Sequence, residues 1–330
     1  MTDMQTLAPF TLHRAGTAAQ AAALLASLPG ARLLAGGTDL LPNLRRGLGS
    51  PTALVDISGV ADIADVSREA QGWRLGAGVT LARLAADPAI AQELPALAQA
   101  AASVAGPGHR NVATLGGNLC LDTRCVYYNQ SEWWRRSNDY CLKHGGDTCH
   151  VAPQGRRCHA AFSGDVAPAL IALDAAVRIV GARGERTVPL VDLYADDGAA
   201  SLRLAKDELI VAAHVPPQPA GSRSGYRKGR IRGAMDFPLA GVAARASFDG
   251  GSLRSLRLAL TGTNSRPLLL ADTDALCGGA IDEAMLGLLG KRISRQASPM
   301  RTTVTASNYR RQVAMVLAQR LLRDLAGAAA

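Results

Sequence analysis

The chain has 330 residues, of which 48% are hydrophobic, and 36 basic against 27 acidic side chains give it a net charge of +9. This length exceeds what one hydrophobic core usually organises and predicts two or three domains. The basic residues are scattered rather than arranged in runs, so we expect no nucleic-acid partner. Neither a signal peptide nor a long uncharged apolar stretch is visible. We therefore expect a cytoplasmic protein with reduced thiols and no contact with a membrane.

Hydrophobic patterns predict alternating helices and strands in the first part of the chain. A helix rich in alanine and leucine should end at Pro29-Gly30, which stops helices. Residues 216–222 are rich in proline and small side chains and predict a domain linker. Helices are expected at 17–28, 40–46, 81–86 and 94–104, and strands at 31–35, 53–57 and 73–78. After the linker, strands are expected at 237–246 and 256–260, and an amphipathic helix between 309 and 323.

Two turns with paired glycines lie in the first part. They read Leu33-Leu34-Ala35-Gly36-Gly37-Thr38-Asp39-Leu40 and Ala113-Thr114-Leu115-Gly116-Gly117-Asn118. Paired glycines let a backbone approach a diphosphate closely and turn several N–H groups towards it. A single Gly-Gly pair is more often only a tight turn. Two such turns in one domain favour a dinucleotide cofactor, although neither matches a Rossmann fingerprint.

Four of the six cysteines lie between residues 125 and 158: Cys125, Cys141, Cys149 and Cys158. Without an export signal, such a group favours metal binding over disulfides. The close cysteine pairs of most zinc sites are missing, and many iron–sulfur proteins also use closer pairs. His150 and His159 directly follow cysteines. The residues favour a four-iron cluster and leave open a mixed zinc site or no metal.

The same segment is rich in aromatic and basic side chains. We expect the aromatic residues to exclude water from a cluster, whose potential depends on solvation. The basic excess suits an acidic electron carrier. The aromatic residues are Tyr127, Tyr128, Trp133, Trp134 and Tyr140.

The two glycine turns, the stretch Gly164-Asp165-Val166-Ala167-Pro168-Ala169-Leu170 and the late Tyr309-Arg310-Arg311 resemble the FAD-binding medium subunits of the xanthine oxidase (molybdenum hydroxylase) family. The resemblance covers nearly the whole chain and implies an α+β fold. It implies a two-part FAD-binding domain of the vanillyl-alcohol-oxidase (PCMH) type at residues 1–217. A C-terminal α+β domain of the CO dehydrogenase flavoprotein type would occupy residues 224–326, and residues 124–160 would be an inserted iron–sulfur loop.

That inserted loop is similar to the one in beta subunits of 4-hydroxybenzoyl-CoA reductases. The similarity lies in Arg124-Cys125, in the run from Tyr128 to Arg135, in Tyr140-Cys141-Leu142-Lys143 and in the spacing of all four cysteines. It implies that Cys125, Cys141, Cys149 and Cys158 hold a [4Fe-4S] cluster. The FAD contacts implied by the family are Leu33, Leu34, Ala35, Gly36, Gly37, Thr38, Asp39, Leu40, Thr114, Leu115, Gly116, Gly117, Asn118, Asp165, Ile210 and Lys228.

The resemblance implies an electron-transfer subunit without catalytic residues of its own. Electrons would pass from reduced ferredoxin through the [4Fe-4S] cluster and FAD to [2Fe-2S] clusters in a small subunit. A molybdenum cofactor in a large subunit would then convert 4-hydroxybenzoyl-CoA to benzoyl-CoA, in a dimer of heterotrimers. Val104 replaces an aromatic residue that xanthine dehydrogenases have beside the flavin, which disfavours NAD. The alternatives are an FAD/[4Fe-4S] medium subunit of an aldehyde or purine oxidoreductase and, from another class, a zinc-stabilised interaction module.

Overall fold

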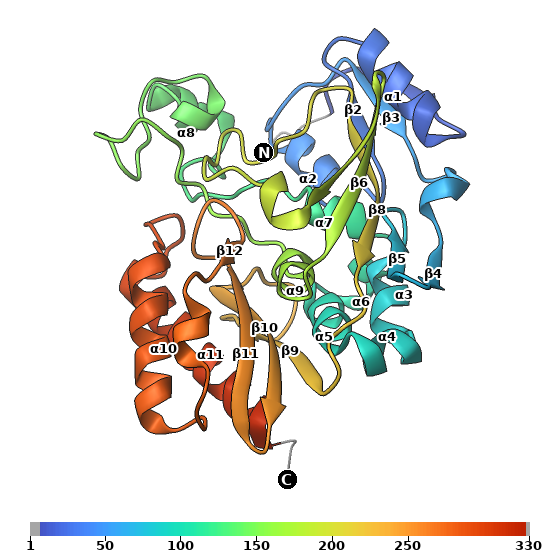
Figure 1. Cartoon of the computed structure of the whole chain (residues 1–330). Coiled ribbons are helices and arrows are strands. Elements are labelled where there is room, and N and C mark those ends of the chain that lie inside the picture. The colour runs from blue at the N-terminus through green and yellow to red at the C-terminus, as the bar shows by residue number, and fades with distance from the viewer. Residues whose placement is uncertain (1–6, 328–330) are drawn as a thin grey trace.

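The computed structural model describes residues 7–327 and has the α+β architecture that the sequence predicts. Two sheets with their helices form the N-terminal part, and a third sheet with two long helices forms the C-terminal part (Figure 1). The inserted segment protrudes beside the N-terminal part, where its helix α8 (Glu132–Ser137) lies far from most of the core. Within residues 7–327, no helix combines the length and the apolar character needed to cross a bilayer.

The first sheet is parallel, with the strand order β1-β3-β2. Its strands are β1 (Thr11–Arg14), β2 (Arg32–Leu34) and β3 (Ala53–Asp56). Helix α1 (Ala18–Ser27) begins where the Thr17 hydroxyl accepts a hydrogen bond from the Gln20 N–H. Helix α2 (Leu40–Arg45) follows β2. The first glycine turn therefore connects the carboxyl end of β2 with the start of α2, the usual place for a ligand loop beside parallel strands.

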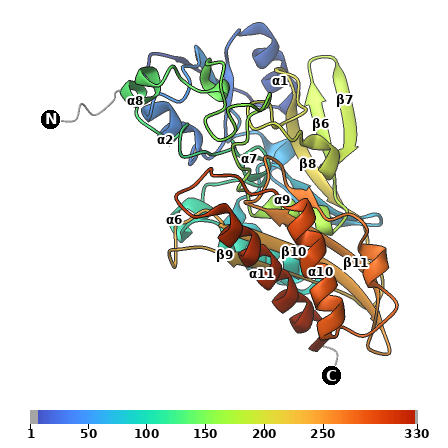
Figure 2. The ribbon, with the colours of Figure 1, turned by 90° about the vertical axis from the view of Figure 1, so that its left-hand side faces the viewer.

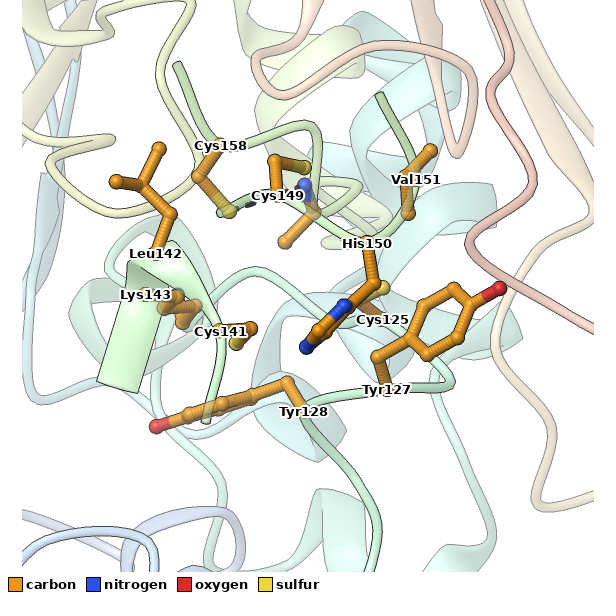
Figure 3. A pocket seen from close by; sticks show the side chains of 11 residues that line it. Cys125, Tyr127, Tyr128, Cys141, Leu142, Lys143, Cys149, His150, Val151 and Cys158 are labelled. Carbon is orange, nitrogen blue, oxygen red and sulfur yellow. Dashed lines mark hydrogen bonds between the residues drawn. The ribbon is translucent and has the colours of Figure 1, made fainter. Parts of the chain in front are cut away.

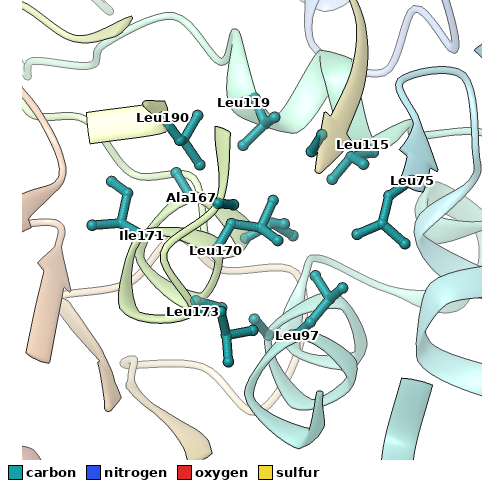
Figure 4. Close-up of a cluster of buried hydrophobic side chains, with 14 of the residues drawn as sticks. Leu75, Leu97, Leu115, Leu119, Ala167, Leu170, Ile171, Leu173 and Leu190 are labelled. Carbon is teal, nitrogen blue, oxygen red and sulfur yellow. The ribbon is translucent and has the colours of Figure 1, made fainter. Parts of the chain in front are cut away.

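The second sheet is antiparallel, with the order β4-β5-β8-β6-β7. Its strands are β4 (Val66–Glu69), β5 (Gly72–Gly76), β6 (Ala176–Gly181), β7 (Gly184–Pro189) and β8 (Leu209–Val215). Helix α9 (Val166–Ala172) is buried along its whole length and forms the centre of the main core (Figure 4). Helices α5 (Pro95–Ser103) and α7 (Leu115–Leu119) pack against it. Helices α3 (Leu81–Ala86) and α4 (Pro88–Glu93) pack against α5, and α6 (Pro107–Arg110) packs against α3.

The third sheet is antiparallel, with the order β12-β11-β10-β9. Its strands are β9 (Ser222–Gly229), β10 (Ala240–Asp249), β11 (Ser252–Thr261) and β12 (Leu268–Leu269). Helices α10 (Glu283–Gln296) and α11 (Ser307–Gly327) cover one face (Figure 2). Successive strand residues point to opposite faces. Val242 accordingly packs with the core under α10 and α11, whereas Ala243 packs with the core around α9.

The helices with a clear hydrophobic pattern were predicted from the sequence, whereas one short strand without such a pattern was not. The helices expected at 17–28, 40–46, 81–86 and 94–104 correspond to α1, α2, α3 and α5. The strand expected at 237–246 begins three residues later, at Ala240, because residues 230–239 form a loop. Strand β1 was not expected, since none of its four side chains is buried and it carries no hydrophobic pattern.

Candidate functional site

The four predicted cysteine ligands line one pocket in the inserted segment (Figure 3). Cys125, Cys149 and Cys158 expose 6%, 5% and 5% of their surface, and Cys141 is half-buried. In the part of the chain that the structure describes, no three His, Cys, Asp or Glu side chains gather closely enough to hold a single metal ion. The thiols instead stand around a common space, with their sulfur atoms on different sides of it.

Two aromatic rings and several aliphatic side chains form the rest of the pocket wall. Tyr127, Tyr128, Leu142 and Val151 line it, together with the polar Lys143 and His150. The expectation that all five aromatic residues shield the thiols is wrong for Trp133, which is 76% exposed on α8. Trp134 contacts the Tyr127 ring from outside, with centroids 6.2 Å apart, so it supports the wall without lining it.

Burial in the pocket raises the pKa of two of its thiols. Burial raises the pKa of Cys158 to about 11, although the Ala160 N–H and the charge of Lys143 act in the opposite direction. Burial also raises the pKa of Cys125, opposed by hydrogen bonds from the N–H groups of Tyr127 and Tyr128. Thiolates in this pocket therefore need a positive partner, which a bound metal would supply.

Two buried cations hold the segment in place. The Lys143 ammonium donates to Asp122 Oδ1, Thr123 Oγ1 and the Gly198 carbonyl at 2.6–2.7 Å. Arg135 on α8 is 1% exposed and donates to the Gln130 carbonyl and Glu132 Oε2 within the segment. It also donates to the Gly47 carbonyl, which joins the segment to the loop after α2. Buried charges are expensive unless they are paired and hydrogen-bonded, so these contacts stabilise the position of the segment.

The first glycine turn presents unpaired backbone donors. Within the described residues, the N–H groups of Gly36, Gly37, Thr38 and Asp39 donate to no atom of the chain. Gly37 has φ +68°, which favours glycine, and a side chain at Gly36 would overlap the Val112 carbonyl oxygen. The remaining predicted contacts Leu33, Leu34, Ala35 and Leu40 are half-buried beside them. Consecutive free N–H groups of this kind form an anion-binding concavity.

The second glycine turn differs from the expectation. The Leu115 and Gly116 N–H groups donate to Val79 and Ala77 carbonyls, and Thr114 Oγ1 accepts from the Gly117 N–H at 3.2 Å. These donors are therefore already used inside the chain, and contact of Thr114, Leu115, Gly116, Gly117 and Asn118 with FAD stays a prediction. Gly116 is required because a Cβ there would approach Ala77 Cβ to 2.9 Å. This turn holds α7 tightly against the residues that follow β5.

Three predicted contacts lie where the N- and C-terminal parts meet. Asn118 Oδ1 accepts from the Val166 N–H at 3.1 Å, which places the neighbouring Asp165. Asp165 and Lys228 form a buried ion pair at 2.9 Å, each side chain 4% exposed, and the Tyr226 hydroxyl donates to the same carboxylate at 2.6 Å. Burial raises the pKa of Asp165, against the effect of Lys228 and Tyr226. The predicted contact Ile210 lies on β8 and packs into the main core.

One ion pair connects the first glycine turn with the cysteine segment. Arg124 Nη2 donates to Asp39 Oδ1 at 2.6 Å, and the Arg124 side chain is 9% exposed. Sequence reasoning did not single out Asp39–Arg124, Lys143, Arg135 or Tyr226 as supporting contacts. A basic residue directly before Cys125 was visible, but its partner is 85 residues away in the chain.

Comparison with known proteins agrees with this architecture. Residues 8–218 match the model of the FAD binding domain in molybdopterin dehydrogenase, and residues 224–325 match the CO dehydrogenase flavoprotein C-terminal domain. The chain is 30% identical to the xanthine dehydrogenase FAD-binding subunit of Escherichia coli O157:H7 over 320 residues, 96% of each chain. It is 35% identical to the aldehyde oxidoreductase FAD-binding subunit of Escherichia coli K12 over 276 residues, 81% of this chain and 85% of that one.

A solved structure shares the fold. The reconstituted CO dehydrogenase from Oligotropha carboxidovorans contains a chain that superposes with a TM-score of 0.81 at 24% identity, over 98% of this chain and 99% of that one. With two family models covering most of the sequence, the chain belongs to the FAD-binding medium subunits of the xanthine oxidase and CO dehydrogenase family of molybdenum hydroxylases.

Proposed function

We propose that this medium subunit carries both FAD and a four-iron cluster and serves as the electron-transfer subunit of a 4-hydroxybenzoyl-CoA reductase. The observation that carries the proposal is the set of four cysteines around one pocket, in a segment similar to that of the reductase beta subunits. The relatives named above are described as xanthine and aldehyde oxidoreductase subunits, and none of these names specifies such a cluster.

The residues present fit a four-iron cluster. Soft thiolates are the donors that iron–sulfur clusters and zinc select. A zinc ion needs all its ligands about 2.3 Å from one point, whereas a four-iron cluster takes one cysteine on each of its corners. Cys125, Cys141, Cys149 and Cys158 line one pocket from different sides, and this arrangement supports the proposal of a cluster. The Ala160 N–H, 3.4 Å from Cys158 Sγ, is the kind of donor that adjusts cluster potentials.

The first glycine turn fits the diphosphate of FAD. Its four consecutive N–H groups lack partners among the described residues, and Thr38 adds a hydroxyl. Asp165 and Lys228 lie in the seam between the two parts of the chain, where domain interfaces commonly hold ligands. Asp165 and Lys228 are also paired with each other, so each would meet a flavin as one member of a neutral pair.

The proposed reaction determines what this subunit must do. Replacing the phenolic hydroxyl of 4-hydroxybenzoyl-CoA by hydrogen, with release of water, takes two electrons and two protons. When bound, the cluster would exchange single electrons and the FAD one or two, so one-electron carriers such as ferredoxin could supply them. The polypeptide contributes binding, orientation and exclusion of water, and it places no acid or base for the chemistry.

The specific alternative is an aldehyde or purine oxidoreductase medium subunit with a similar cluster, because the relatives carry those names. Both candidates predict a flavin and a cluster, and they differ in the direction of electron flow and in the substrate. Val104, half-buried at the end of α5, stands where the family resemblance places an aromatic residue. Its small aliphatic side chain provides no stacking surface for a nicotinamide, which supports ferredoxin over NAD.

The test begins with iron, sulfide and flavin counts on the purified chain, for which we expect four irons, four sulfides and one FAD. The chain is then assembled with its large and small subunits, and flavin reduction is followed by stopped flow with reduced ferredoxin and with NADH. We expect rapid reduction by ferredoxin and formation of benzoyl-CoA from 4-hydroxybenzoyl-CoA. Flavin reduction by an aldehyde or a purine, without turnover of the acyl-CoA, would establish the alternative. One zinc and no flavin would contradict both.

A further inference from the structure

The cysteine segment begins and ends at one pair of backbone hydrogen bonds. The Arg124 N–H donates to the Ala161 carbonyl and the Ala161 N–H donates to the Arg124 carbonyl, both at 2.8 Å. Cys125 follows the first of these residues, and Cys158 lies three residues before the second. The position of Arg124 therefore affects two of the four thiols.

The side chain of Arg124 extends from this backbone pair to the first glycine turn. Its Nη2 lies 2.6 Å from Asp39 Oδ1, while Asp39 Oδ2 accepts from Asn43 on the first turns of α2. The other terminal nitrogen, Nη1, is buried and has no hydrogen-bond partner within residues 7–327. Separating Arg124 from Asp39 would leave a buried guanidinium without a carboxylate, which is strongly unfavourable.

The same ion pair determines the net charge beside the first glycine turn. Asp39 is the last of the four residues with free N–H groups, so its carboxylate lies beside the place where a diphosphate would sit. Alone, that carboxylate would repel an anion. Arg124 neutralises it while holding the turn in position. Arg124 thus contacts the first glycine turn through its side chain and Ala161, at the end of the cysteine segment, through its backbone.

We propose that the Arg124–Asp39 ion pair couples FAD binding at the first glycine turn to the closure of the thiol pocket. Arg124 is in this sense a positioning residue for both sites. The coupling rests on the proposed placement of FAD but not on the identity of the metal. Because coupling free energy is reciprocal, FAD should protect the thiols by the same factor by which closure of the pocket tightens FAD binding.

The experiment uses the full-length chain, freed of flavin and iron and fully reduced. The probe reaction is modification of thiols by dithiobis(nitrobenzoate), measured with and without FAD, and FAD affinity is measured by quenching of flavin fluorescence. In the wild type, we expect FAD to slow the modification of the segment thiols about tenfold, within the usual range for coupled sites. In Arg124→Met, we expect this protection to disappear and the Kd for FAD to rise about tenfold.

Two further variants separate coupling from general damage. Arg157→Met is the matched control, because Arg157 also directly precedes a cysteine and also forms an ion pair, with Asp196 at 3.1 Å, away from the glycine turn. It should retain protection of the thiols by FAD. Adding Asp39→Asn to Arg124→Met should bring FAD affinity back towards the wild-type value, since the repelling charge is gone, and Arg124→Lys should restore part of the protection.

The outcomes separate this inference from the proposed function. Loss of protection in Arg124→Met but not in Arg157→Met, with improved FAD affinity in the double variant, supports the coupling even if the native chain carries no iron. Thiol modification indifferent to FAD in the wild type would overturn the coupling, even if iron and flavin are both found. A double variant that binds FAD more weakly than Arg124→Met would overturn the charge argument.

Discussion

At the scale of single residues, the thiol pocket depends on side chains that the cysteine spacing does not reveal. Lys143 lines the pocket and donates to three oxygen atoms outside it. Arg135 connects α8 with the Gly47 carbonyl, and Arg124 connects the beginning of the segment with Asp39. Their partners, among them Asp39, Gly47 and Gly198, are remote in sequence. The grouping of the four cysteines could be predicted from their sequence, whereas the side chains that support them required the folded chain.

We expect Cys141→Ser to remove or degrade the cluster while FAD stays bound. A serine hydroxyl is a hard donor that replaces a soft thiolate, and the glycine turns lie outside the inserted segment. The measurement is the iron, sulfide and flavin content of the purified variant. Cys277→Ser, far from the pocket lining, is the control and should match the wild type. Unchanged iron in Cys141→Ser would remove this residue from the ligand set.

At the scale of elements, the two glycine turns show how similar sequences make different local hydrogen bonds. The first turn leaves its N–H groups free, whereas the second uses them to fasten α7 to the residues after β5. Both contain Gly-Gly beside a threonine, so the local pattern predicted one role for both. The difference arises from Val79 and Ala77, whose carbonyls accept from the second turn. The sequences of the two motifs do not predict where these distant acceptors lie.

Valine substitutions should therefore affect the two turns differently. Gly37→Val places a β-branched residue at positive φ and 3.1 Å from Leu41, so we expect a clear loss of FAD affinity. Gly117 has no positive φ, and a Cβ there meets only Thr114 Oγ1 at 3.1 Å. Gly117→Val should keep more of the FAD affinity than Gly37→Val in the same titration. Equal losses in both variants would argue that the second turn also contacts the diphosphate.

An ion pair at the edge of the second sheet should make the stability of the fold depend on pH. Arg186 on β7 donates to both carboxylate oxygens of Glu208, and this contact lowers the pKa of Glu208 to about 2. A carboxylate with a lowered pKa stabilises the fold above its ordinary pKa and loses that contribution as pH falls towards the folded value. Glu208→Gln should be less stable than the wild type at pH 7. In urea titrations, the difference should shrink as the pH falls from about 5 to about 2.

At the scale of the whole molecule, the N- and C-terminal parts are joined through buried polar groups as well as apolar ones. Asp165 belongs to the N-terminal part, and its partners Tyr226 and Lys228 lie on β9. The family resemblance implied Asp165 and Lys228 separately as flavin contacts. Their mutual pairing could not be predicted, because it depends on how β9 packs against α5.

Breaking this pair should destabilise the whole chain. We expect Lys228→Met to lower the free energy of unfolding by about 3–5 kcal/mol, because it leaves a buried carboxylate without its cation. Urea unfolding followed by circular dichroism measures this loss. Arg227→Met is the control, since Arg227 pairs with an exposed partner, Asp324, and exposed pairs contribute less than about 1 kcal/mol. Similar losses in both variants would show that the Asp165–Lys228 pair has no special role.

The antiparallel contact between Arg124 and Ala161 also has an evolutionary consequence. Because the two ends of the segment meet there, a gene could gain or lose residues 125–160 in one event without shifting the strands and helices on either side. A deletion variant that joins these ends by a short glycine–asparagine turn should keep its circular dichroism spectrum and its flavin. If it does, cluster-bearing and cluster-free medium subunits are separated by one modular exchange rather than by gradual remodelling of the flavin scaffold.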